Sequence, residues 1–132
     1  MLFILRWKEL WLRRLENALY PFTHTWISHP VRDDYWRHGS VGEDYTRLHC
    51  PILLVGGWSD MYSETIFRMA EHHQGPLKLI CGPWDHLYPD VSLMGPRIEF
   101  MRECLRWYDY HLKDIANGIM AEPKLRLYMK EG

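Results

Sequence analysis

The sequence predicts an α/β fold with parallel strands, from two apolar runs and the segment that separates them. CPILLVGGWSD (Cys50–Asp60) and LKLICGPWDH (Leu77–His86) each begin with a short apolar stretch that suits a strand buried on both faces. The segment between them has the length of one helix. We therefore expect a right-handed strand–helix–strand crossover with the two parallel strands in one sheet.

The elements of this unit follow from the apolar runs and their breakers. We expect the first strand at residues 51–56, a helix from Ser63 to about His73, and the second strand at Leu77–Cys81. Ser63 is placed to cap the helix, and an apolar face follows it. The helix then ends at Gln74, Gly75 and Pro76, of which the glycine and the proline disfavour helix.

The flanking segments predict further helices. Residues 4–19 have apolar side chains at helical spacing, and Asp33–His38 reads as a short helical turn capped by Asp33. A long helix is expected from Pro96 to about Lys113, with a buried stripe of Ile98, Met101, Leu105, Tyr108 and Leu112. Lys124–Met129 alternates like the first strand of a further structure that the sequence does not complete.

The composition supports a folded core and argues against nucleic acid and membranes as partners. Of the 132 residues 47% are apolar, and 16 Lys or Arg against 17 Asp or Glu give a net charge of −1. This balance gives no excess of positive charge with which to bind nucleic acid or an anionic membrane. No apolar stretch approaches the length of a membrane span. The opening apolar run is too short for a signal peptide, so a cytoplasmic location is the default expectation.

Asp60 and His86 are the candidate catalytic residues, because each lies just beyond the carboxyl end of a predicted strand. In open parallel sheets the active site lies outside those ends. An acid followed by a histidine is also the second half of the Ser…Asp…His order of α/β-hydrolases, in which the carboxylate orients a general-base histidine. Such a pair should lie within about 3.5 Å. On spacing alone, two solvated loop residues that never meet are an equally good explanation.

No serine in the sequence fits the nucleophile position. The nearest match to the G-x-S-x-G elbow is HGSVG (His38–Gly42), which has a histidine in place of the first glycine and no strand before it. Ser40 is therefore read as a loop serine. Cys81 would lie inside a strand, without a reason for a lowered thiol pKa. Neither the histidine spacing nor the three cysteines predict a metal site or a disulfide, so we expect no metal and no cofactor.

Several motifs resemble the CocE/NonD acyl-hydrolase family, within the Xaa-Pro dipeptidyl-peptidase-like (S15) group. They are HPVRDDYWRHGSV, RLHCPILLVGGWSD, GPWDH followed by YPD, the helix FMRECLRWYDYHLK, and NGIMAEPKLRLYM. The resemblance covers about residues 7–131. It implies a serine hydrolase that acts on ester or peptide bonds through a Ser-His-Asp triad, with Asp60 matching the acid and His86 matching the base.

The resemblance also implies that the sequence is a part of a larger enzyme, with a partial α/β-hydrolase fold. Residues 1–30 would be the end of a helical cap region, 31–118 the C-terminal part of the hydrolase domain, and 119–132 the start of a truncated jelly-roll domain. Trp58 and Trp84 flank the matched positions. They could form a wall of the substrate pocket, and core packing explains them equally well.

The family's catalytic serine lies N-terminal to everything in this sequence. The chain therefore lacks the nucleophile that would form the covalent acyl intermediate. We expect the C-terminal part of a serine-type acyl hydrolase, inactive by itself. Its partners would be a small ester or peptide substrate in the full-length form, and a missing N-terminal half or further copies of the chain. The alternative is a non-catalytic binding or interaction module that retains part of the hydrolase fold. Either way, the unpaired edge of the first strand predicts a marginal fold unless a partner covers it.

Overall fold

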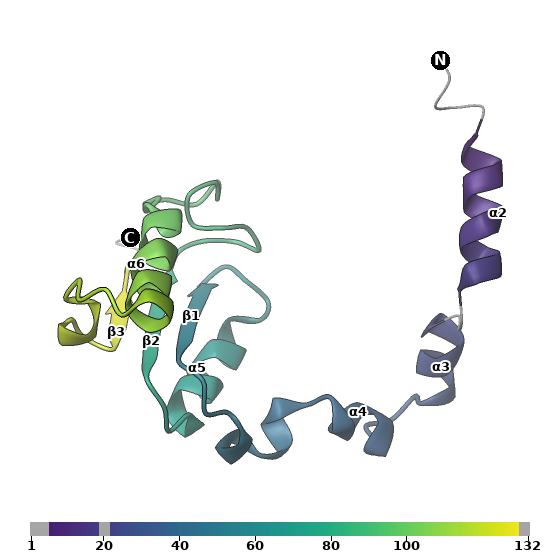
Figure 1. The fold of residues 1–132 in the computed structure, drawn as a ribbon, viewed down its shortest axis with the longest axis horizontal. Coiled ribbons are helices and arrows are strands. Elements are labelled where there is room, and N and C mark those ends of the chain that lie inside the picture. Colours follow the sequence, from purple (N-terminus) through teal and green to yellow (C-terminus); the bar gives the residue numbers. More distant parts are fainter. Residues whose placement is uncertain (1–5, 19–21, 130–132) are drawn as a thin grey trace. The chain divides into compact units, whose positions relative to one another are not determined.

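The computed structural model describes residues 6–18 and 22–129, within two compact units, Met1–Ser40 and Val41–Gly132. The first unit contains the helices α2 (Trp7–Asn17), α3 (Phe22–Ser28) and α4 (Asp34–His38), shown in Figure 1. None of the three helices has a buried side chain among the described residues. The unit therefore has no core of its own within that part of the chain.

Two of the three helices described in the first unit were predicted. The helix expected at 4–19 is confirmed over Trp7–Asn17, while residues 1–5 and 19–21 lie outside the described part of the chain. The cap of α4 is also confirmed, because the Asp33 carboxylate accepts a hydrogen bond from the Tyr35 N–H at 3.0 Å. Helix α3 was missed, since its seven residues carry no sustained apolar period.

The second unit contains a parallel sheet of three strands in the order β1 (Ile52–Gly57), β2 (Leu77–Gly82) and β3 (Leu125–Leu127). The first two strands fall where the apolar runs predicted them, and the chain has a partial α/β fold. From the sequence, we expected the strand at Lys124–Met129 to begin a further structure that the sequence does not complete. In the structure, β3 pairs with β2. Within the described residues β1 has a neighbour on one side only.

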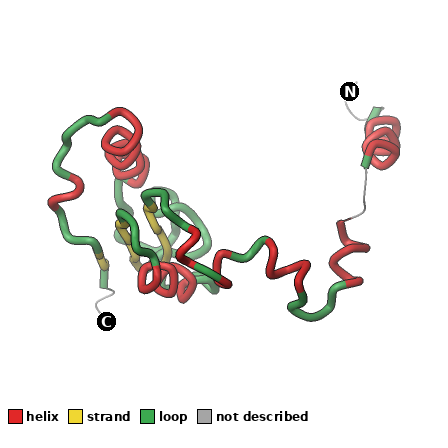
Figure 2. Tube along the Cα trace, turned by 60° about the horizontal axis from the view of Figure 1, so that its bottom comes forward, coloured by secondary structure: helices red, strands yellow, loops and turns green. Residues whose placement is uncertain are grey.

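Helices α5 (Ser63–His72) and α6 (Phe100–Lys113) lie on opposite faces of this sheet, as Figure 2 shows. The core lies between the sheet and α5 and consists of Leu54, Leu77, Leu79 and Cys81, with Ile52, Ile66, Phe67, Met69 and Ala70 packed against it. Three short 3-10 helices complete the unit: η1 (Val41–Glu43), η2 (Tyr45–Arg47) and η3 (Ile119–Ala121). The expected Ser63 cap is wrong, since α5 is preceded by Tyr62 and has no side-chain cap.

The predicted buried stripe of α6 is wrong, and so is its predicted start at Pro96. The helix begins at Phe100, its buried residue is Trp107, and four of the five stripe residues are exposed: Met101, Leu105, Tyr108 and Leu112. A charged face turns inward instead. Arg126 pairs with Glu103 at 3.2 Å and with Glu122 at 2.7 Å, and Arg106 bonds both acids. These ion pairs link α6 to the chain around β3.

The central strand contributes a buried lysine to the same region. Lys78 is 6% exposed, and its ammonium donates hydrogen bonds to the backbone carbonyls of Glu122 and Pro123. Burial lowers the pKa of Lys78, and the nearby Glu122 carboxylate opposes that change. The lysine thus fixes the segment that leads into β3.

No helix within the described ranges is long and apolar enough to cross a membrane.

Candidate active site

Asp60 lies in the turn between β1 and α5. Its backbone N–H bonds to the Gly57 carbonyl at 3.1 Å, and its Oδ1 accepts a hydrogen bond from the Tyr62 N–H at 2.8 Å. The side chain is 15% exposed. The Tyr62 N–H, and after it the bond to His86, lower the pKa of Asp60, since both favour the charged carboxylate. The turn therefore holds an ionised acid at the carboxyl end of β1.

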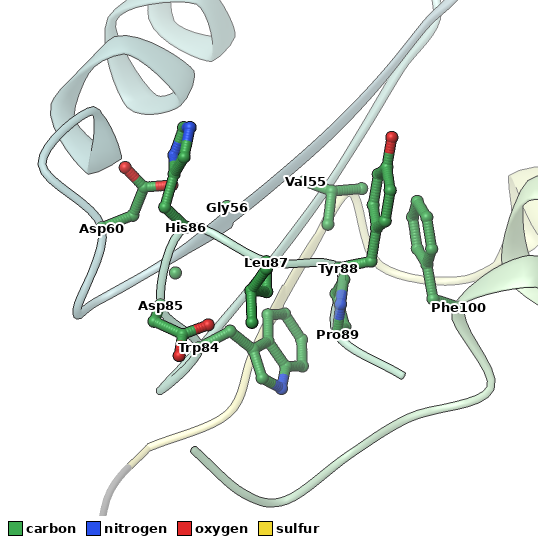
Figure 3. Close-up of a pocket in the computed structure, with 11 residues that line it drawn as sticks. Val55, Gly56, Asp60, Trp84, Asp85, His86, Leu87, Tyr88, Pro89 and Phe100 are labelled. Carbon is green, nitrogen blue, oxygen red and sulfur yellow. The ribbon is translucent and has the colours of Figure 1, made fainter. Parts of the chain in front are cut away.

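His86 lies in the loop after β2, and its imidazole lies beside the Asp60 carboxylate in Figure 3. Its Nδ1 is 3.0 Å from Oδ2 of Asp60. This distance falls within the limit of about 3.5 Å expected of a hydrogen-bonded acid–base pair. A carboxylate can only accept, so Nδ1 carries the proton and Nε2 is left for proton transfer. The His86 side chain is 72% exposed. The arrangement is that of a carboxylate orienting a general-base imidazole.

The acid loop and the histidine loop are held together by their backbones. The Trp58 N–H donates to the Gly82 carbonyl at 2.7 Å, and the Ser59 N–H donates to the Trp84 carbonyl at 3.1 Å. This approach requires glycine at position 57, where a Cβ atom would lie 2.0 Å from the Trp84 oxygen. Gly57 is thus the residue that lets the two loops meet.

A pocket of about 410 Å³ lies beside the Asp60–His86 pair. The two residues and Asp85 form its polar part, and aromatic and aliphatic side chains form the rest, including Trp84, Leu87, Tyr88, Pro89 and Phe100 (Figure 3). The rings of Tyr88 and Phe100 stack, with centroids 5.5 Å apart. An apolar cavity with a few convergent polar groups is typical of a small-molecule site.

Of the two tryptophans predicted to line a pocket, the structure brings Trp84 to the pair and places Trp58 elsewhere. Trp84 lines the cavity, is 1% exposed and donates from its indole to the Pro96 carbonyl at 2.8 Å. Trp58 is not among the lining residues. Its indole donates to the Tyr128 carbonyl at 2.9 Å, and its ring stacks on Phe67.

Eight of the eleven lining residues were not predicted as site residues, and three of them are of interest: Asp85, Tyr88 and Phe100. Asp85 and Tyr88 belong to the GPWDH and YPD motifs, so their closeness to His86 in sequence was a usable signal. Phe100 begins α6, and its place in the pocket depends on the tertiary fold rather than on its position in the sequence. Asp85 is bound to Ser92, which is buried.

The described lining of the pocket holds no serine, threonine or cysteine. Ser40 belongs to the first unit, whereas the residues that line the pocket all belong to the second. Cys81 is fully buried in β2, and burial raises the pKa of its thiol to about 11. No group of three or more His, Cys, Asp or Glu side chains in the described ranges is arranged to hold a metal ion.

Comparison with known proteins gives the family. The X-Pro dipeptidyl-peptidase (S15 family) model matches residues 4–88, which include both members of the Asp60–His86 pair. Cocaine esterase from Rhodococcus sp. (strain MB1 Bresler) is 25% identical over 114 residues, which are 78% of this chain and 20% of the esterase. The chain thus spans a fifth of the length of this relative. Because the family match covers more than half of the sequence, the chain belongs to the X-Pro dipeptidyl-peptidase S15 family, as a CocE/NonD hydrolase-like region.

Proposed function

We propose that this chain supplies the acid and the base of a serine-type acyl hydrolase that acts on ester or peptide bonds. Asp60 is the acid, His86 is the base, and the nucleophilic serine comes from outside these 132 residues. The observation that carries the proposal is the 3.0 Å contact between Asp60 Oδ2 and His86 Nδ1 at the edge of a pocket of about 410 Å³. Family membership supports the same chemistry.

The proposed mechanism follows from the protonation states in this pair. Nε2 of His86 takes the proton of the serine hydroxyl as the serine attacks the substrate carbonyl, and later returns a proton to the leaving group. Asp60 stabilises the imidazolium that forms in between. Its lowered pKa keeps it charged at neutral pH. The Tyr88–Phe100 stack and Trp84 offer an apolar surface for the acyl or leaving group.

The domain organisation is part of this proposal. Residues 1–30 would end a helical cap, 31–118 would form the C-terminal part of an α/β-hydrolase domain, and 119–132 would lead into a jelly-roll domain. The free side of β1 supports the partial nature of the sheet, since an apolar edge strand normally has a neighbour or a cover.

The first experiment uses the chain alone. We expect it to hydrolyse p-nitrophenyl esters no faster than its His86→Ala variant and to take up no fluorophosphonate, because an activated serine is needed for both. Fluorophosphonate labelling of a serine within the chain would contradict the proposed source of the nucleophile.

The second experiment restores the serine by placing this chain in the matching segment of Rhodococcus cocaine esterase. If the chimera hydrolyses p-nitrophenyl esters, Asp60→Asn should lower kcat by about 10⁴-fold, since the histidine then takes the wrong tautomer. The matched control is Asp34→Asn, which changes an exposed acid of the first unit that pairs with Arg37 and should leave kcat unchanged. An Asp60→Asn chimera with unchanged kcat would refute the assigned role.

A non-catalytic interaction module is the second candidate, and one feature favours it. The exposed side chains of Met101, Leu105, Tyr108 and Leu112 form an apolar stripe at helical spacing on α6. This stripe could bind a partner without any chemistry at Asp60. Under this candidate, binding would depend on the α6 stripe, and Asp60→Asn would have no effect.

A further inference from the structure

The loop that carries His86 is closed by a buried serine. Ser92 has no exposed surface, and its hydroxyl donates to Oδ1 of Asp85 at 3.0 Å. The Ser92 hydroxyl oxygen in turn accepts from the backbone N–H groups of Asp85 at 3.4 Å and Met94 at 3.1 Å. One hydroxyl thus joins Asp85, the residue before His86, to a segment seven to nine residues further along. A buried polar group with this many bonds fixes the backbone around it.

Further bonds brace the same loop from outside. The Arg97 Nε donates to the Ser92 carbonyl at 2.8 Å, and the Trp84 indole donates to the Pro96 carbonyl. The Ser92 N–H bonds to the Tyr88 carbonyl at 2.9 Å. His86 itself makes no contribution to this closure. The loop is therefore shaped independently of the imidazole that it presents.

His86 has an acid on either side, and the loop determines which of them it meets. In Figure 3 the Asp60 carboxylate lies beside the imidazole, whereas the Asp85 side chain points away from it. Asp85 is the immediate neighbour of His86 in sequence, but its Oδ1 is bound to Ser92. The hydrogen bond to Ser92 thus keeps the carboxylate of Asp85, the neighbour of His86 in sequence, away from the imidazole.

We propose that Ser92 and Asp85 are a pair of positioning residues that hold the His86 loop so that Nδ1 meets Asp60 and no other carboxylate. The inference rests on the proposed function, because the position of His86 matters only if it acts as the base. Ser92 is not a nucleophile in this scheme, since its hydroxyl is buried and bound to Asp85.

The test measures the tautomer of His86 by ¹⁵N NMR of the 132-residue chain labelled at histidine nitrogen. With Asp60 bound, the proton should reside on Nδ1. We expect Ser92→Ala to shift His86 toward the tautomer mixture of free imidazole and to speed hydrogen exchange of the Met94 amide by about tenfold, through loss of one buried hydrogen bond. Ser59→Ala is the matched control, because Ser59 is exposed, adjoins Asp60 and contributes only its backbone N–H.

A second pair of variants approaches the same bond from the acid. Asp85→Asn retains an oxygen that can accept from Ser92 and should keep the Nδ1 tautomer, while Asp85→Leu should lose it. This rescue by the conservative variant separates positioning from a general loss of stability. The two Asp85 variants also test the positioning role if Ser92→Ala fails to fold.

The outcomes separate this inference from the function on which it rests. If Asp60→Ala changes the His86 tautomer but Ser92→Ala and Asp85→Leu do not, the positioning role is overturned and the proposed pair remains. If Asp60→Ala itself leaves the tautomer unchanged, the Asp60–His86 pair is overturned, and the positioning role with it.

Discussion

The described residues contain two hydrogen-bonded Asp–His pairs, one in each unit, and their differences show what makes such a pair useful. In the first unit, His29 Nδ1 is 2.6 Å from Asp33 Oδ2, four residues away. In the second, His86 and Asp60 are 26 residues apart and joined at 3.0 Å. Each aspartate also accepts a hydrogen bond from the N–H two residues further on.

The two pairs differ in what surrounds the imidazole. The His29 ring is stacked on Tyr35 with centroids 4.5 Å apart, and the backbone carbonyl of His29 accepts a hydrogen bond from the Trp36 indole. The pair therefore caps a short helix and packs against it. His86 instead adjoins a pocket and has most of its side chain exposed. A bonded Asp–His pair is therefore no signature of catalysis by itself. Its position at the carboxyl ends of two parallel strands is what sets the second pair apart.

The strongest way to break only the second pair is to add a side chain at Gly57. Gly57→Ala places a Cβ atom 2.0 Å from the Trp84 carbonyl, so the two loops must separate. We expect the free energy of unfolding to fall by about 3 kcal/mol and the His86 tautomer to change. Urea denaturation and ¹⁵N NMR measure the two effects. Gly39→Ala, next to the first pair, is the control, since its Cβ would meet nothing within 4 Å. Equal losses in both variants would argue against the close approach at Gly57.

A smaller effect should distinguish the two tryptophans near the second pair. Trp84→Phe removes the bond to Pro96 at a site that is 1% exposed, and should cost about 2 kcal/mol. Trp58→Phe removes the bond to Tyr128 at a site that is 39% exposed, and should cost about 0.5 kcal/mol. Chemical denaturation measures both values. A larger cost at Trp58 would show that its packing on Phe67 matters more than the geometry indicates.

The two carboxylates should respond differently to loss of their histidines. The bond to His29 is the main cause of the lowered pKa of Asp33, whereas the Tyr62 N–H is the main cause for Asp60, with His86 second. His29→Ala should therefore raise the pKa of Asp33 more than His86→Ala raises that of Asp60. Carboxyl ¹³C NMR titrations of the two variants measure both values. The reverse order would show that His86 binds Asp60 more strongly than the backbone does.

The smallest expected effect is on acid stability. The folded-state pKa of Asp60 lies below its unfolded value of about 3.9, so its stabilising contribution is complete above that pH and is lost as the pH falls through the folded value. Asp60→Asn should flatten this part of the curve of unfolding free energy against pH, measured between pH 6 and pH 2. Asp33→Asn should flatten it as well, because the pKa of Asp33 is lowered too. Unchanged acid limbs in both variants would contradict the lowered values.

The parts of the fold predicted from sequence are those encoded by short-range patterns. Buried parallel strands are nearly continuous apolar runs, so β1 and β2 were found with their order and with the positions of Asp60 and His86. The failures come from long-range effects. The stripe of α6 was assigned to the core because it is apolar, but the ion pairs of Glu103 and Arg106 turn the opposite face inward. No local pattern shows that Glu122 and Arg126 will meet them.

The site shows the same division. The Asp60–His86 pair and Trp84 are adjacent to strand ends, and sequence position was enough to suggest them. Phe100 reaches the pocket only because the loop after His86 folds back, and that path is set by Ser92 and by the Trp84 indole. The His29–Asp33 pair was not predicted either, although Asp33 was identified as a helix cap.

The free side of β1 has a consequence for the cavity beside His86. Val55, Gly56 and Gly57 of this strand line that cavity, so whatever lies along the strand also borders the cavity. A polypeptide added there in parallel would bring its own carboxyl end to the rim where the imidazole lies. Extending the sheet at this edge would therefore also add a wall to the cavity beside His86.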